Sequence, residues 1–133
     1  MAHMETVATT KSKEIVDITP TVEKLLRKQK LEEGLCHVFA LHTTGAVTTA
    51  DLDPGTDLDM LDAFEKIVPK LHYRHPHNPE HVPDHIMSTI LGPGVLIPVH
   101  QGELKLGTWQ RVIFVELDGP RKRQIAVTFI RGE

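Results

Sequence analysis

The feature that most constrains the fold is a series of short apolar stretches rich in β-branched residues. They occupy residues 13–18, 35–41, 46–52, 109–117 and 124–130. Val, Ile and Thr favour strands because their branched side chains pack well on a pleated surface. Helical patterns interrupt these strands without the regular alternation of strand and helix that builds a parallel sheet. The sequence therefore predicts an α+β fold with a largely antiparallel sheet.

About three helices are expected among the strands. A Thr-Pro pair at residues 19–20 marks the first, because proline is well tolerated at the first helical position. Apolar residues recur at helical spacing over 58–68, and a third, short helix is predicted over 83–91. Two further short strands, 95–100 and 103–106, flank a Gln-Gly pair and predict a hairpin.

The length of 133 residues suits a single domain with its own hydrophobic core. The first four residues, MAHM, are typical of an expression scar, so we expect the domain to span residues 5–133 and leave His3 out of every site.

Composition argues against two classes of partner. A net charge of -3 and few aromatic residues give no basic, base-stacking surface for nucleic acid. No apolar run is long enough to span a bilayer. The single cysteine, Cys36, lies in an apolar stretch, which predicts a buried thiol in a protein of the reducing cytoplasm.

Five histidines and three prolines crowd the segment 71–85, which we predict to be mostly loop because proline lacks a backbone donor. Imidazole is a common metal ligand and titrates near neutral pH. The segment is therefore a candidate metal or acid–base site, with a solvated histidine-rich loop as the alternative. The histidines are His72, His75, His77, His81 and His85.

His42, Thr43 and Thr44 follow an apolar strand and precede Gly45. An imidazole, two hydroxyls and a glycine that allows close backbone approach suit a ligand or anion pocket. The alternative is an ordinary turn at a strand end, with the histidine hydrogen-bonded locally.

Glu116 and Gln110 share one otherwise apolar face of the predicted strand 109–117. The carboxylate is a candidate general base or organiser of a metal, and the alternative is an ion pair with Arg121 or Arg123. Arg121 follows a Gly-Pro turn, and its planar guanidinium suits phosphate. A solvated turn charge is the alternative for Arg121.

Taken together, these motifs resemble the YjbQ family over nearly the whole chain. The resemblance rests on His42-Thr43-Thr44, on the spaced His75 and His85, on Leu106-Gly107-Thr108-Trp109-Gln110 and on Asp118-Gly119-Pro120-Arg121. The chain departs from the family pattern at Gly45, where many members carry alanine, and at Asp84, where a small residue is usual.

The resemblance implies a β-sandwich flanked by helices, a homotrimer, and a secondary thiamine phosphate synthase activity that joins a pyrimidine pyrophosphate to a thiazole phosphate. It places His42, His75 and His85 at the family's histidine positions and Glu116 at its acidic position. We therefore expect these histidines to converge on a divalent metal ion, zinc or magnesium, and His72, His77 and His81 to be more exposed.

The working hypothesis assigns catalysis to Glu116 and His42 and binding of a small phosphorylated metabolite to four residues: Thr43, Thr44, Gln110 and Arg121. Trp109 is expected to be structural. Two alternatives use the same residues. One is metal-assisted hydrolysis of a phosphorylated metabolite, and the other is a non-catalytic trimer that binds a metal or anion.

Overall fold

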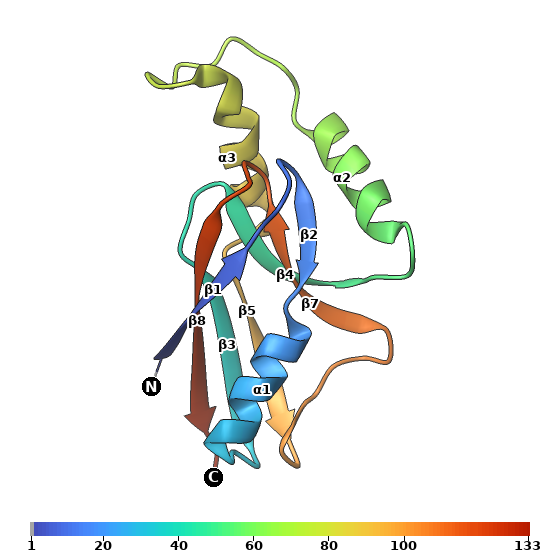
Figure 1. Ribbon diagram of the computed structural model, residues 1–133, viewed down its shortest axis with the longest axis vertical. Coiled ribbons are helices and arrows are strands. Elements are labelled where there is room, and N and C mark those ends of the chain that lie inside the picture. The colour runs from blue at the N-terminus through green and yellow to red at the C-terminus, as the bar shows by residue number, and fades with distance from the viewer. Residues whose placement is uncertain (1) are drawn as a thin grey trace.

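A computed structural model describes residues 2–133 (Figure 1). It contains eight strands, three α-helices and one 3₁₀ turn. In chain order they are β1 (Ala2–Ala8), β2 (Glu14–Asp17), α1 (Thr19–Gln29), β3 (Gly34–Ala40), β4 (Gly45–Asp51), α2 (Thr56–Ile67), η1 (Pro79–His81), α3 (Val82–Leu91), β5 (Gly94–His100), β6 (Glu103–Leu104), β7 (Gln110–Glu116) and β8 (Lys122–Arg131).

The strands form two antiparallel sheets. One has five strands in the order β1-β8-β3-β5-β6, and the other has three in the order β2-β7-β4. The principal core lies between them, where Val38 and Val127 of the larger sheet and Phe114 of the smaller belong to one buried cluster with α1. The α+β sandwich expected from the sequence is confirmed.

The second face of the three-stranded sheet is also buried. Ile113 and Val115 of β7 pack in a separate cluster that includes Met87 of α3 and Val68, the residue after α2. The layers are therefore sheet, sheet and helices, and β7 is covered on both sides. A strand buried on both faces is apolar without interruption, which explains the continuous run in its sequence.

Three local predictions are confirmed. The third helix begins at Val82, with Pro83 in its first turn and His81 just outside it. The β5–β6 hairpin turns at Gln101 and Gly102, both at positive φ. Cys36 is fully buried, and burial raises the pKa of its thiol to about 12, so it is a core residue and not a nucleophile.

The first strand was not predicted from the sequence. Residues 2–4, interpreted as an expression scar, belong to β1 and pair with Thr128, Val127 and Ala126 of β8. Among residues 2–133, none of the helices has the length and apolar character needed to cross a bilayer.

Candidate functional site

Three connections meet at one end of the sandwich. They are the β3–β4 loop (41–44), the β7–β8 connection (117–121) and the start of α3, in the upper half of Figure 1. The backbone N–H of Leu117 donates to the carbonyl of Thr44 at 3.1 Å and ties the first two together. The sequence motifs containing His42, Glu116 and Arg121 are thus neighbours in the fold.

Beneath these loops lies a buried ion pair between Glu116, 0% exposed, and Arg123, 1% exposed. The Nε of Arg123 donates to both carboxylate oxygens, at 2.9 and 3.1 Å, and its Nη2 donates to Oε2. Of the roles considered for Glu116, the ion pair with Arg123 is the one observed. Because the carboxylate is enclosed, the structure favours an organising role for Glu116 over that of a general base, and its part in catalysis stays a prediction.

Other groups complete the hydrogen bonding of this carboxylate. The Thr9 hydroxyl donates to Oε1 at 2.6 Å, and the Asp118 N–H donates to Oε2 at 3.1 Å. Burial by itself would raise the pKa of Glu116, but the hydrogen bonds from Arg123, Thr9 and Asp118 outweigh it and hold the pKa below its ordinary value. Glu116 is therefore ionised at neutral pH.

His42 lies above this pair. Its Nδ1 is 3.2 Å from the backbone nitrogen of Thr44 and 3.1 Å from the Thr44 hydroxyl, which also accepts a hydrogen bond from Arg123 at 2.9 Å. Burial, followed by the positive charges of Arg123 and Arg121, lowers the pKa of His42. At neutral pH the ring is therefore uncharged.

His85 and His75 lie next to the same loop. The Nδ1 of His85 is 3.0 Å from the carbonyl oxygen of Thr43. The rings of His75 and His85 stack, with centroids 5.3 Å apart and an interplanar angle of 9°. The Nδ1 of His75 accepts from the backbone N–H of His77 at 3.1 Å.

The guanidinium of Arg121 is half exposed and is held by Asp118. Its Nε donates to the Asp118 carbonyl at 2.9 Å, and its Nη2 donates to the Asp118 carboxylate at 3.2 Å. Two nitrogens are thus fixed by the turn, half of the side chain is exposed, and its positive charge acts on the ring of His42. This geometry suits contact with an anionic group.

Gln110 does not join this group. It begins β7 whereas Glu116 ends it, and six residues of extended strand separate them by about 20 Å. Its amide donates to the Thr49 hydroxyl at 2.9 Å and accepts from the Gly107 N–H at 3.0 Å. The prediction that Gln110 contacts substrate beside Glu116 is therefore wrong for this arrangement. The two residues share one face of β7, but they lie at opposite ends of the strand. The adjacent Trp109 is 71% exposed and packs little within one chain.

The expectation that His72, His77 and His81 are more exposed than the other three histidines is wrong for His81, which is partly buried in a different cluster, whereas His42 and His75 are exposed. The Nδ1 of His81 is 3.4 Å from a carboxylate oxygen of Asp84 and 3.5 Å from one of Asp118. Lys13 contacts Asp84, and Arg121 contacts Asp118, so both carboxylates already have cationic partners. The unusual Asp84 thus ties α3 to the β1–β2 connection.

In residues 2–133, this His81 cluster is the one group of three or more potential metal ligands whose atoms all lie within 4.8 Å of one another. His42, His75 and His85 do not form such a group within one chain. His42 lies in the β3–β4 loop, His85 in the first turn of α3 and His75 in the loop before η1, and their ring nitrogens do not meet around a common point. The metal ion stays a prediction.

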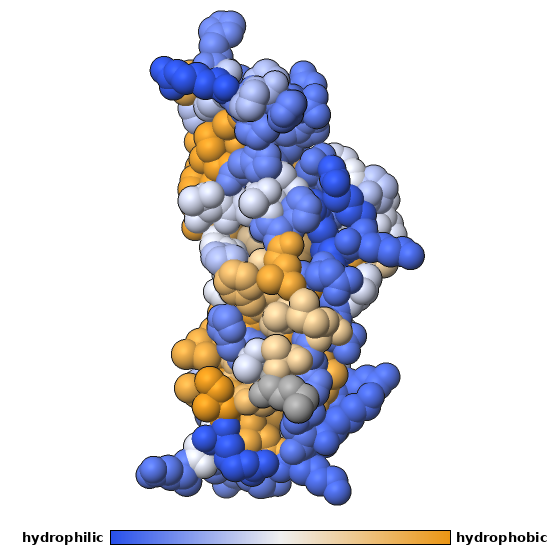
Figure 2. All heavy atoms as spheres, turned by 90° about the vertical axis from the view of Figure 1, so that its left-hand side faces the viewer, coloured by the Kyte–Doolittle hydropathy of each residue, from blue (hydrophilic) through white to orange (hydrophobic). Residues whose placement is uncertain are grey.

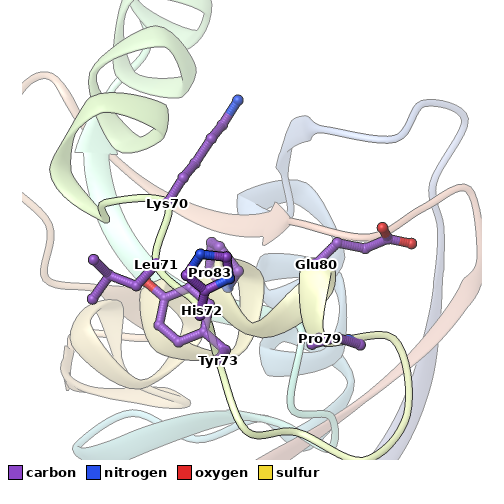
Figure 3. A pocket seen from close by; sticks show the side chains of 7 residues that line it. All are labelled: Lys70, Leu71, His72, Tyr73, Pro79, Glu80 and Pro83. Carbon is purple, nitrogen blue, oxygen red and sulfur yellow. The ribbon is translucent and has the colours of Figure 1, made fainter.

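Figure 3 shows a surface hollow of about 540 Å³ on the histidine- and proline-rich loop. The rings of His72 and Tyr73 form one wall near Pro83, whereas Lys70 and Glu80 extend away from them. The hollow contains none of the three histidines of the expected site. We therefore assign no reaction to it.

Sequence reasoning did not identify two residues of the hydrogen-bond network around Glu116 as site residues. Arg123 was considered only as a possible ion-pair partner, and Thr9 was not considered. Arg123 lies on the same face of β8 as the buried Ile125 and Val127. A cation on an otherwise apolar strand face is the sequence signal that could have identified it. Thr9 lies 107 positions from Glu116 and gave no signal, because only the tertiary fold brings them together.

The fold and the site define a class of small two-sheet α+β proteins with imidazoles above a buried Glu–Arg pair. The family profile described as UPF0047 protein YjbQ-like matches residues 3–132, and the chain belongs to this family.

The relatives cover most of the chain. It is 40% identical to a UPF0047 protein of Archaeoglobus fulgidus over 123 residues, 92% of this chain and 95% of the relative. It is 40% identical to the UPF0047 protein YjbQ of Salmonella typhimurium over 117 residues, 84% of this chain and 83% of the relative. The crystal structure of a hypothetical protein from Aeropyrum pernix K1 superposes with a TM-score of 0.92 at 32% identity, covering 99% of each chain.

Proposed function

We propose that the chain is a transferase of the thiamine-phosphate-synthase type, acting on phosphorylated metabolites, with this reaction as a secondary activity. The observation that carries the proposal is that His42 and the half-exposed Arg121 stand on two adjoining loops over the buried Glu116–Arg123 pair, near enough for the charge of Arg121 to lower the pKa of His42. Such an arrangement provides fixed hydrogen-bond donors and positive charge for a phosphate or pyrophosphate group.

The reaction requires stabilisation of a leaving group. The bond between the pyrimidine's methylene carbon and a pyrophosphate oxygen breaks, and its electron pair stays on the oxygen. The thiazole nitrogen then forms the new bond to that carbon. Negative charge grows on pyrophosphate, so cations aimed at its oxygens lower the barrier. Arg121 is the exposed arginine that could take this role. The Glu116–Arg123 pair holds Thr44, and with it the β3–β4 loop, in place.

Assembly as a homotrimer is part of the proposal. The outer face of the five-stranded sheet exposes Met4, Leu96 and Ile130, and Figure 2 shows hydrophobic side chains gathered over the lower part of one face. Exposed apolar surface of this kind marks interaction sites. A cytoplasmic location is also part of the proposal, and it is supported by the buried, unpaired Cys36.

The test is incubation of purified protein with both precursors, together and separately, with products identified by mass spectrometry. Release of pyrophosphate and formation of thiamine phosphate only when both are present supports the transferase. Release of phosphate from one precursor alone identifies the hydrolase, and retained ligand without turnover identifies a binding protein. Lys122→Gln is the matched control for Arg121→Gln, since Lys122 is an adjacent exposed cation outside the network.

A further inference from the structure

The hydrogen-bond partners of the three histidines differ in kind, and that difference fixes which ring nitrogen carries the proton. A neutral imidazole has one N–H donor and one acceptor nitrogen. A backbone N–H can only donate, and a backbone carbonyl can only accept. The partner of each Nδ1 therefore determines what the opposite nitrogen, Nε2, presents to a ligand.

For His42 the partner is a donor. The Thr44 N–H points at Nδ1 at 3.2 Å, so Nδ1 accepts and the neutral ring carries its proton on Nε2. The Thr44 hydroxyl reinforces this. Arg123 donates to its oxygen at 2.9 Å, which leaves the hydroxyl proton free to point at Nδ1, 3.1 Å away. Glu116 holds Arg123 in place from below, so a buried ion pair supports the orientation of the ring.

His75 follows the same rule and His85 the opposite one. The His77 N–H donates to Nδ1 of His75 at 3.1 Å, so His75 also presents an Nε2–H donor. The Nδ1 of His85 lies 3.0 Å from the Thr43 carbonyl, so it must carry the proton and donate. His85 thus presents an Nε2 lone pair. A histidine that ligates a metal donates its other N–H in this way, which His42 and His75 do not.

We propose that the three histidines form a donor–donor–acceptor site for a phosphorylated ligand and not a three-histidine metal centre. His42 and His75 offer Nε2–H groups to anionic oxygens of phosphate or pyrophosphate. His85 is the ring that accepts, from a donor such as an amino N–H of the same ligand. This inference rests on the proposed function, which supplies a ligand carrying both kinds of group. A metal on Nε2 of His42 or His75 would require the neutral ring to lose its only proton, or to give up the hydrogen bond that Nδ1 accepts from the backbone.

The direct test is long-range ¹H–¹⁵N NMR of the uniformly ¹⁵N-labelled protein at about pH 8, above the ordinary imidazole pKa. Single His→Gln variants assign each ring by the loss of one spin system. We expect protonated Nε2 and unprotonated Nδ1 for His42 and His75, and the reverse for His85. Protonated Nδ1 in His42 or His75 would overturn the proposal.

A second test uses inorganic pyrophosphate and calorimetry on metal-free protein. The amide nitrogen of glutamine reaches about as far as Nε2, whereas that of asparagine reaches only as far as Nδ1. We therefore expect His42→Gln to retain binding and His42→Asn to weaken it about tenfold, as for loss of one hydrogen bond to a charged group. Equal binding by the parent and both variants contradicts the donor role, provided that the variants melt at the parent's temperature.

Zinc titration covers the competing possibility. Tight Zn²⁺ binding that is lost in His42→Leu, His75→Leu and His85→Leu alike would establish the metal centre and sink the proposal. The two levels of inference fail separately. Correct tautomers and pyrophosphate binding without thiamine phosphate synthesis refute only the proposed function, whereas synthesis with reversed tautomers refutes only the assignment of the histidines.

Discussion

At the scale of residues, the Glu116–Arg123 pair shows how a polar group in a core becomes a support for a site. Both side chains are fully enclosed, and the carboxylate receives hydrogen bonds from three residues. A buried ion pair of this kind adds little stability relative to apolar residues, but removing one partner strands the other charge. Its role is therefore to fix Thr44 and the loop that carries His42.

Glu116→Gln should destabilise the protein by about 3–5 kcal/mol, because Arg123 is then buried without a counter-charge. The double variant Glu116→Leu/Arg123→Met should recover much of that loss. Urea denaturation of the parent and the two variants measures both effects. A cost below about 1 kcal/mol for Glu116→Gln would show that water reaches the guanidinium.

Stability should also depend on pH through Glu116. Its folded pKa lies below the ordinary value of 4.5, so the unfolded chain takes up a proton more readily as the pH falls. The contribution of Glu116 is therefore complete above about pH 4.5 and is lost as the pH falls toward the folded pKa. Asp17 and Glu33 also have lowered pKa values, so the comparison must be with Glu116→Gln. Between about pH 5 and pH 3, the parent should lose more free energy of unfolding than this variant.

Arg121→Lys should weaken binding of phosphate ligands with little change in melting temperature. Lysine cannot reproduce the fork that bonds Asp118 through two nitrogens while presenting the rest of the guanidinium to solvent. Trp109→Phe serves as the contrasting variant, expected to lose stability in the assembled protein before it loses affinity. Calorimetry and thermal unfolding score the two properties separately. Undiminished phosphate binding by Arg121→Lys means that this arginine is only a turn charge.

At the scale of elements, the first residue of strand β4, Gly45, is a glycine for a steric reason. A Cβ at this position would lie 2.6 Å from Cζ of Phe114, the buried residue of β7 beside it. The glycine at this position is thus explained by the neighbouring strand. The two positions are coupled, and neither can be interpreted alone.

Gly45→Ala should cost about 1–3 kcal/mol through overpacking against the Phe114 ring. In a Phe114→Leu background, the same substitution should cost clearly less, because the smaller side chain makes room. A double-mutant cycle from denaturant unfolding gives the coupling free energy. A coupling near zero would mean that β4 shifts as a unit to admit the methyl group.

At the scale of the whole molecule, the five-stranded sheet has one face in the core and one that no helix of residues 2–133 covers. Met4, Leu96 and Ile130 lie on that outer face by the register of the strands. Helices cover the three-stranded sheet instead. This asymmetry leaves a surface suited to a second copy of the chain.

The parent should therefore sediment as a trimer at micromolar concentration, and Leu96→Glu should shift it toward monomer while leaving the monomer's fold intact. The charge would lie at an apolar contact but outside the core of the single chain. Analytical ultracentrifugation with circular dichroism checks both points. Ala63→Glu, which adds the same charge at an exposed position of α2 away from that face, is the control. A monomeric parent would refute the assembly.

The sequence by itself determined most of the elements, because their signals are local. Period and β-branching located β7 and β8, and Pro83 placed the start of α3 within one residue of the observed Val82, with His81 outside the helix. The sequence also identified His42, Glu116 and Arg121 as candidate site residues, because each lies beside a strand end or a turn.

Only the tertiary structure decided how these residues combine. Thr9 reaches Glu116 across 107 positions, Gln110 is separated from the site by the length of β7, and His81 meets Asp118 from another connection. The strand β1 needed β8 as a partner before it could be recognised. Contacts between distant segments depend on packing and strand register, which local sequence patterns do not reveal. The partner of a side chain and its protonation state therefore follow from the fold and not from its neighbours in sequence.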